Sequence, residues 1–186
     1  MTSHYFPDAD EPALQPFTQS FVRLMFAHAA FERRVSDLMG IITDVTGFGE
    51  RPENQWKADA RPRRMKKLIN KYRPDGLPET DRIVACLKRS VPFCHTRNLL
   101  AHGSWWEFVA DAITVRSGIA RKGKDQHQVF AWADIQCAAM SLDELEVELS
   151  KLQSAIEARL PSDRPIAARG SVRAHWFRLT AVIRRQ

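Results

Sequence analysis

One apolar pattern in the first quarter of the chain constrains the fold more than any other feature. Apolar side chains recur at three- and four-residue spacing from Phe17 to Val45, and Gly47 and Gly49 then end the pattern. This spacing places the apolar residues on one face of a helix of about eight turns. Other apolar surfaces have to cover such a face, so the sequence predicts a mainly helical domain.

Two further helices are expected in the middle of the chain. The segment 51–73 is strongly basic and has apolar residues at helical spacing, and the Pro-Asp-Gly sequence at 74–76 predicts a turn after it. A third helix is expected from Thr80, acting as its N-terminal cap, to Gly103. Pro92 should kink or restart this helix, because proline removes a backbone donor.

The stretch between the third helix and the last long helix, about residues 104–133, is predicted to be a small β insertion. It contains three short β-prone runs, at 105–109, 112–116 and 129–132. The last long helix is expected to begin at Ser141, where Glu144 completes a capping box, and to end at Pro161. The expected fold is therefore a mainly α helical bundle with a small antiparallel β insertion.

The length of 186 residues and the hydrophobic content of 44% fit one domain, which we expect at residues 17–160. A flexible N-terminal arm at 1–16 and a basic, arginine-rich C-terminal tail at 161–186 should flank it. No signal peptide is evident, and charged residues interrupt every apolar stretch, so a cytoplasmic protein without a membrane partner is expected.

The cysteines and histidines give no sign of a metal site. Cys86, Cys94 and Cys137 lack the spacing of a redox or metal-binding motif, so we expect reduced, buried thiols. Cys94, His95 and His102 do not form a zinc site, because adjacent residues point about 100° apart on a helix. Neither a metal nor another cofactor is expected.

The formal net charge of +6 favours a polyanionic partner. The candidate RNA-binding residues lie on the expected second helix and in the β insertion: Arg63, Arg64, Lys66, Lys67, Lys71, Trp105, Arg121, Lys122 and Lys124. The alternatives are a solvated basic face for the helix and packing of Trp105 within the sheet.

Arg97, Asn98 and His102, near the end of the third helix, are the residues best suited to chemistry. Asn98 and His102 are one turn apart and share a face, while Arg97 is offset but long enough to reach it. Cleavage of RNA without a metal needs a base for the 2′-hydroxyl, an acid for the leaving 5′-oxygen and positive charge beside the phosphorane. Histidine exchanges protons near neutral pH, arginine binds phosphate through its forked donors, and asparagine can orient the imidazole or bind a phosphate oxygen.

The run Arg-Asn-Leu-Leu-Ala-His at 97–102, followed by Gly103, resembles the RxxxxH motif of HEPN domains. The resemblance implies a helical domain over roughly residues 17–160 and a homodimer in which two copies of the motif meet. It also implies a metal-independent endoribonuclease that leaves 2′,3′-cyclic phosphate ends, as in toxin and phage-defence systems. Other family members only bind nucleotides or assemble with partners. The segment from Gly103 to Ala133 departs from a minimal HEPN bundle.

Three functions remain as hypotheses: an endoribonuclease, a non-catalytic module that binds RNA or a nucleotide, and a regulatory subunit with a cognate antitoxin or a nucleotidyltransferase as partner. His28 and Glu32, one turn apart beside the apolar face of the first helix, are candidate supporting residues, because antiparallel packing would bring them near the motif. In the alternative interpretation, the helix macrodipole stabilises His102, and Arg97 pairs with an acidic residue such as Glu32.

Overall fold

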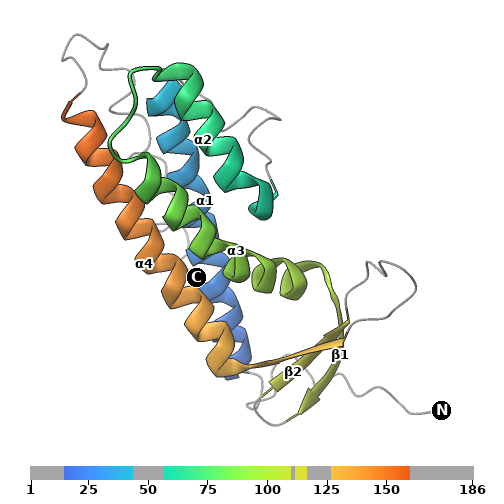
Figure 1. Ribbon diagram of the computed structural model, residues 1–186. Coiled ribbons are helices and arrows are strands. Elements are labelled where there is room, and N and C mark those ends of the chain that lie inside the picture. The colour runs from blue at the N-terminus through green and yellow to red at the C-terminus, as the bar shows by residue number, and fades with distance from the viewer. Residues whose placement is uncertain (1–14, 44–56, 110–111, 117–126, 160–186) are drawn as a thin grey trace, which may run out of the picture.

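The computed structural model describes residues 15–43, 57–109, 112–116 and 127–159. In order along the chain, its elements are α1 (Gln15–Thr43), η4 (Ala58–Ala60), α2 (Arg61–Tyr72), α3 (Thr80–His102), β1 (Ser104–Val109), β2 (Ala112–Arg116), β3 (His127–Ala131) and α4 (Trp132–Glu157) (Figure 1). The prediction of a mainly helical fold with a small antiparallel sheet before the last long helix is confirmed.

The core forms around α1, which packs mainly against α4. These two helices are parallel, since Arg23 contacts Asp143 while Arg34, further along α1, bonds Glu146 and Gln153. The apolar positions of α1 are buried as the periodicity predicts, and so are those of α4. Burial of one large apolar side chain contributes about 1.5–3 kcal/mol, so this interface supplies much of the stability.

α3 runs antiparallel to α1 and α4 and continues through Pro92 without interruption. Figure 1 shows that the helix bends midway, and that its second half turns toward β1. Proline causes such a bend because its ring crowds the preceding turn and it has no N–H to donate. The expected turn at 74–76 is also present, and Gly76 adopts a positive φ of 87° there.

Two predicted helix starts are wrong. α4 begins at Trp132 rather than at Ser141, because Ile135, Ala138 and Ala139 extend its buried face toward the N-terminus. The Asp134 carboxylate accepts a hydrogen bond from the Ala131 N–H (3.2 Å) at this earlier start. At the start of α3, Thr80 is the first helical residue and does not act as a cap.

The Thr80 hydroxyl instead donates to the Leu77 carbonyl (2.6 Å), and Glu79 takes the cap position.

Of the cysteines, Cys86 and Cys94 are buried as expected, but Cys137 is exposed. It is exposed because it lies outside the buried stripe that Ala138 and Ala139 continue on α4.

The sheet has the order β1-β2-β3 with antiparallel neighbours, and a register irregularity lies between Trp105 and Glu107. Ile113, Val115 and Phe130 are buried against the helices. The sheet therefore connects the end of α3 to the start of α4. None of the described helices is both long and apolar enough to cross a membrane.

Candidate functional site

The motif residues lie in the second half of α3, after the bend. Leu100, between Asn98 and His102, is fully buried and packs this part of the helix into the core. The helix ends at His102, and the Gly103 N–H donates to the Leu99 carbonyl (2.7 Å). The structure thus holds Arg97, Asn98 and His102 on a fixed helical frame.

Asn98 and His102 are exposed and one turn apart on the same face of α3. Arg97 is partly buried, and its Nη1 donates to Oδ1 of Asn98 (3.0 Å). The Nε of Arg97 is enclosed and has no hydrogen-bond partner among the described residues. An enclosed guanidinium N–H without a partner is uncommon in a folded protein, so it marks a position where an acceptor is missing.

Side chains from three helices form a group that we call the inner cluster: His28, Glu32, Arg61, Cys94 and Arg97. The Nη2 of Arg61 lies 2.7 Å from Oε1 and 2.8 Å from Oε2 of Glu32. The Nε2 of His28 lies 3.4 Å from Oε1 of Glu32. Arg61 is the first residue of α2 and is buried.

Burial and charge determine the protonation of the inner cluster. Burial lowers the pKa of His28 from 6.5 to about 4, and the positive charges of Arg97 and Arg61 act in the same direction. Burial also raises the pKa of the Cys94 thiol. At neutral pH, His28 is therefore uncharged and Cys94 is protonated, so neither one is a ready proton donor or nucleophile.

His28, Glu32 and Cys94 have ligand atoms within 4.8 Å of one another, close enough to share a metal ion. However, both carboxylate oxygens of Glu32 already accept from Arg61, and Arg97 brings a second positive charge near His28. Two guanidinium groups repel a cation and attract an anion. The inner cluster therefore fits an anion better than a metal.

His28 and Glu32 lie on the Arg97 side of α3 and not at His102, although Nη1 of Arg97 reaches Asn98 on the exposed face. Residues five apart on a helix point about 140° away from each other, which accounts for this separation. The interpretation in which Arg97 pairs with Glu32 does not match the geometry, because Arg61 takes that carboxylate.

Sequence reasoning missed two residues of this region. His95 was considered only as a metal ligand, yet it shares the exposed stripe of α3 with Asn98 and His102, at spacings of three and four residues. Its Nε2 lies 2.7 Å from Oδ1 of Asp59, in η4. Helical spacing was the signal that could have found His95, whereas no local signal marks Arg61 among the other basic residues of α2.

A groove of about 900 Å³ lies between α3 and the segment formed by η4 and α2. It is lined by Asp59, Pro62, Arg63, Lys66, Asp81, Val84, Ala85, Lys88, Val91 and Pro92. On α3, the helical spacing of Val84, Lys88 and Val91 continues into the exposed stripe that ends at His102. The groove therefore leads toward the motif.

The predicted RNA-binding residues are divided between the groove and other surfaces. Arg63 and Lys66 line the groove, while Arg64, Lys67 and Lys71 are exposed elsewhere on α2. Trp105 lies in β1, but its side chain is outside the described part, as are Arg121, Lys122 and Lys124.

No protein-family model, curated protein or solved structure matches this chain. We therefore draw its function from the arrangement of its own residues.

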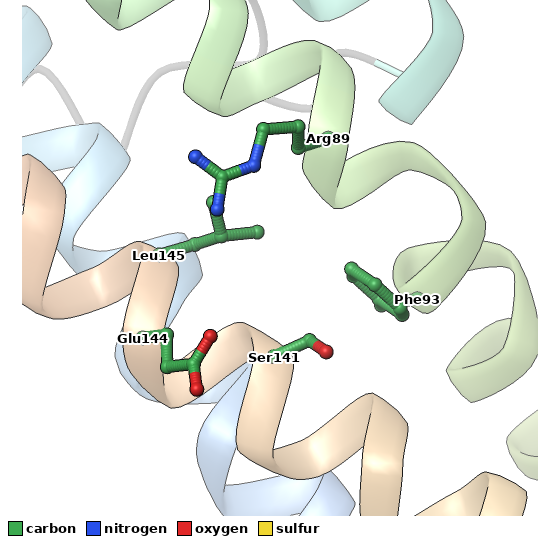
Figure 2. Close-up of a pocket in the computed structure, with 5 residues that line it drawn as sticks. All are labelled: Arg89, Phe93, Ser141, Glu144 and Leu145. Atoms are coloured by element: carbon green, nitrogen blue, oxygen red, sulfur yellow. The ribbon is translucent and has the colours of Figure 1, made fainter.

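A second hollow, of about 160 Å³, lies between α3 and α4 (Figure 2). Arg89 and Phe93 line it from α3, and Ser141, Glu144 and Leu145 line it from α4. It opens on the side of α3 opposite the exposed stripe and has no histidine in its lining, so it does not belong to the same site.

The chemistry available on the exposed side of α3 is that of proton exchange and phosphate binding. His102 and His95 offer imidazoles, and Arg97, held by Asn98, offers a guanidinium. The adjacent groove adds the positive side chains of Arg63 and Lys66. Such a set of groups suits a phosphodiester more than an uncharged substrate.

Proposed function

We propose that this protein is a metal-independent endoribonuclease in which two copies of the chain each contribute Arg97, Asn98 and His102. The observation that carries the proposal is the state of Arg97, which has no carboxylate partner among the described residues and lies next to the exposed Asn98. A phosphate oxygen is the acceptor that such a guanidinium binds best.

In the proposed reaction, His102 of one copy accepts the proton of the RNA 2′-hydroxyl, and the 2′-oxygen attacks the adjacent phosphorus. Arg97 stabilises the negative charge of the phosphorane, while Asn98 holds the guanidinium in place. The bond to the 5′-oxygen breaks, and His102 of the second copy gives this oxygen its proton. The products are a 2′,3′-cyclic phosphate and a free 5′-hydroxyl.

The groove between α2 and α3 supports RNA as the substrate. Positive side chains on its α2 wall can neutralise successive phosphates, and it leads along α3 to the motif. A cytoplasmic toxin or phage-defence role, with a cognate antitoxin as partner, fits an activity of this kind and forms part of the proposal.

The proposed activity is tested by incubating the full chain with single-stranded RNA and transfer RNA in excess EDTA. We expect cleavage with cyclic phosphate ends, and a loss of about a hundredfold or more in His102→Ala, because a positioned acid or base contributes that much. His95→Asn is the matched control, since it removes the other exposed imidazole of the same stripe.

Three outcomes would contradict this assignment: loss of cleavage in EDTA, full activity in folded His102→Ala, or loss of activity in His95→Asn equal to that in His102→Ala. The third would make the site a two-histidine arrangement within one chain rather than a composite of two copies.

A second candidate is a non-catalytic RNA-binding module, which the basic groove favours because it does not depend on His102. In this case the protein binds RNA without cutting it, and His102→Ala leaves the affinity for RNA unchanged.

A regulatory subunit that pairs with a nucleotidyltransferase would instead show a change of oligomeric state in Arg97→Ala.

A further inference from the structure

Arg61 has an unusual place for an arginine of a basic helix. The other arginines and lysines of α2 are exposed, whereas the Arg61 side chain is only 7% exposed and points inward to Glu32 of α1. Its Nη2 lies within hydrogen-bond distance of both carboxylate oxygens. A buried charge is costly unless it is paired, so Arg61 and Glu32 depend on each other.

Arg97 is the second cation of the inner cluster, and it has no carboxylate partner among the described residues. Arg97 follows Cys94 by about one turn on the same face of α3, and the Cys94 sulfur lies within 4.8 Å of a Glu32 carboxylate oxygen. Glu32 is therefore a carboxylate close to the Arg97 side of α3, and Arg61 already binds it. If Arg61 were absent, Glu32 would lose its partner and attract Arg97.

We propose that Arg61 is a positioning residue, which holds the Glu32 carboxylate away from Arg97 and so keeps the Arg97 guanidinium available for an RNA phosphate. The role of Arg61 in RNA cleavage rests on the proposed function. The exchange of ion-pair partners, in which Glu32 pairs with Arg97 once Arg61 is removed, does not. Arg61 does not touch the RNA in this arrangement, because its side chain is buried and bound to Glu32.

The test uses two variants of the full chain and one matched control. Arg61→Met keeps a long side chain but removes the charge that binds Glu32. Arg61→Met/Glu32→Gln removes the carboxylate as well, so Arg97 has nothing to pair with. Arg34→Met is the control, because it breaks a comparable ion pair to Glu146 (2.7 Å) at the α1–α4 interface, away from the inner cluster.

The first readout is RNA binding and cleavage. We expect the RNA affinity and the cleavage rate of Arg61→Met to fall by about ten- to a hundredfold. This is the range expected when a charge-assisted hydrogen bond to phosphate is lost. The double variant should recover to within about threefold of the wild type, because Arg97 is released again. Arg34→Met should match the wild type despite its loss of stability.

The second readout is the titration of His28 followed by NMR, which requires no activity. Four groups face His28: Glu32 on its own helix, Arg61 on α2, and Cys94 and Arg97 on α3. In Arg61→Met, the inner cluster loses one of the two positive charges that lower the pKa of His28, so this pKa should rise from about 4. In the double variant it should fall again, because Glu32 no longer carries a charge.

The proposal is overturned if folded Arg61→Met binds RNA as the wild type does, or if the double variant remains as weak as the single one. An unchanged pKa of His28 in Arg61→Met would also overturn it. If the wild type does not cleave RNA but the pKa of His28 rises and falls as expected, the proposed function fails while the exchange of partners stands.

Discussion

At the scale of single residues, the inner cluster shows how a buried ion pair can leave a neighbouring charge unsatisfied. Nη2 of Arg61 binds the Glu32 carboxylate, and among the described residues Arg97 has a hydrogen bond to the amide oxygen of Asn98 but no carboxylate partner. His28 lies 3.4 Å from the Glu32 carboxylate and carries no charge at neutral pH. This arrangement places one available guanidinium next to the exposed motif.

His28 should make the stability of the protein depend on pH. Its pKa is lowered from 6.5 to about 4 in the folded state, so the unfolded chain binds the proton more readily between these values. The stabilisation is complete above pH 6.5 and is lost as the pH falls toward 4. From about pH 7.5 to about pH 5, we expect the wild type to lose about 2 kcal/mol more unfolding free energy than His28→Gln.

Urea denaturation at the two pH values measures this difference. Equal pH dependence in His28→Gln and the wild type would show that His28 is solvated rather than buried.

At the scale of elements, Leu100 links the motif to the core, because it is fully buried on the same turns of α3 that carry Asn98 and His102. Leu100→Ala should cost roughly 2–5 kcal/mol of unfolding free energy and should also loosen the end of α3. Leu149→Ala on α4 is the matched control for the same loss of a buried side chain.

Where both variants remain folded, RNA cleavage should fall further in Leu100→Ala than in Leu149→Ala. Chemical denaturation gives the stability change, and a cleavage assay at the same temperature gives the activity. Equal activity at equal stability would show that Leu100 contributes only to the core.

Periodicity predicted the helices, the small sheet and the turn at 74–76, because these depend on local spacing and on proline and glycine. It placed the start of α4 wrongly at Ser141, since a capping sequence inside a helix looks the same as one at its start. The pairing of Arg61 with Glu32 was not predictable, because it joins helices whose relative placement only the fold determines. The motif itself was visible at 97–102, but whether it cleaves RNA remains a prediction.

At the scale of the whole molecule, positive side chains from two helices meet in the groove: Arg63 and Lys66 of α2 and Lys88 of α3, beside Asp59 and Asp81. The groove variant Arg63→Gln/Lys66→Gln/Lys88→Gln, which removes these three charges, should therefore weaken RNA binding. It should also reduce the slope of log affinity against log salt by about 2, since each contact to single-stranded nucleic acid contributes about 0.7.

A control variant removes the same number of charges from outside the groove: Arg23→Gln/Arg89→Gln/Lys151→Gln. RNA binding measured at several salt concentrations compares the two variants. If the control reduces the slope as much as the groove variant does, attraction is a property of the net charge, and the groove has no special part in it.

The pairing of α1 with α4 has a consequence for how the chain is made. Arg34 and Glu146 are 112 residues apart in sequence, so α1 leaves the ribosome long before the helix that covers it. At about 5–20 residues per second, this interval is on the order of ten seconds. Leu100 packs into the same core, so the motif is fixed only after α4 has been synthesised. A nascent chain that lacks α4 therefore carries an unfinished site, and we expect any cleavage of RNA to begin only after α4 has packed against α1.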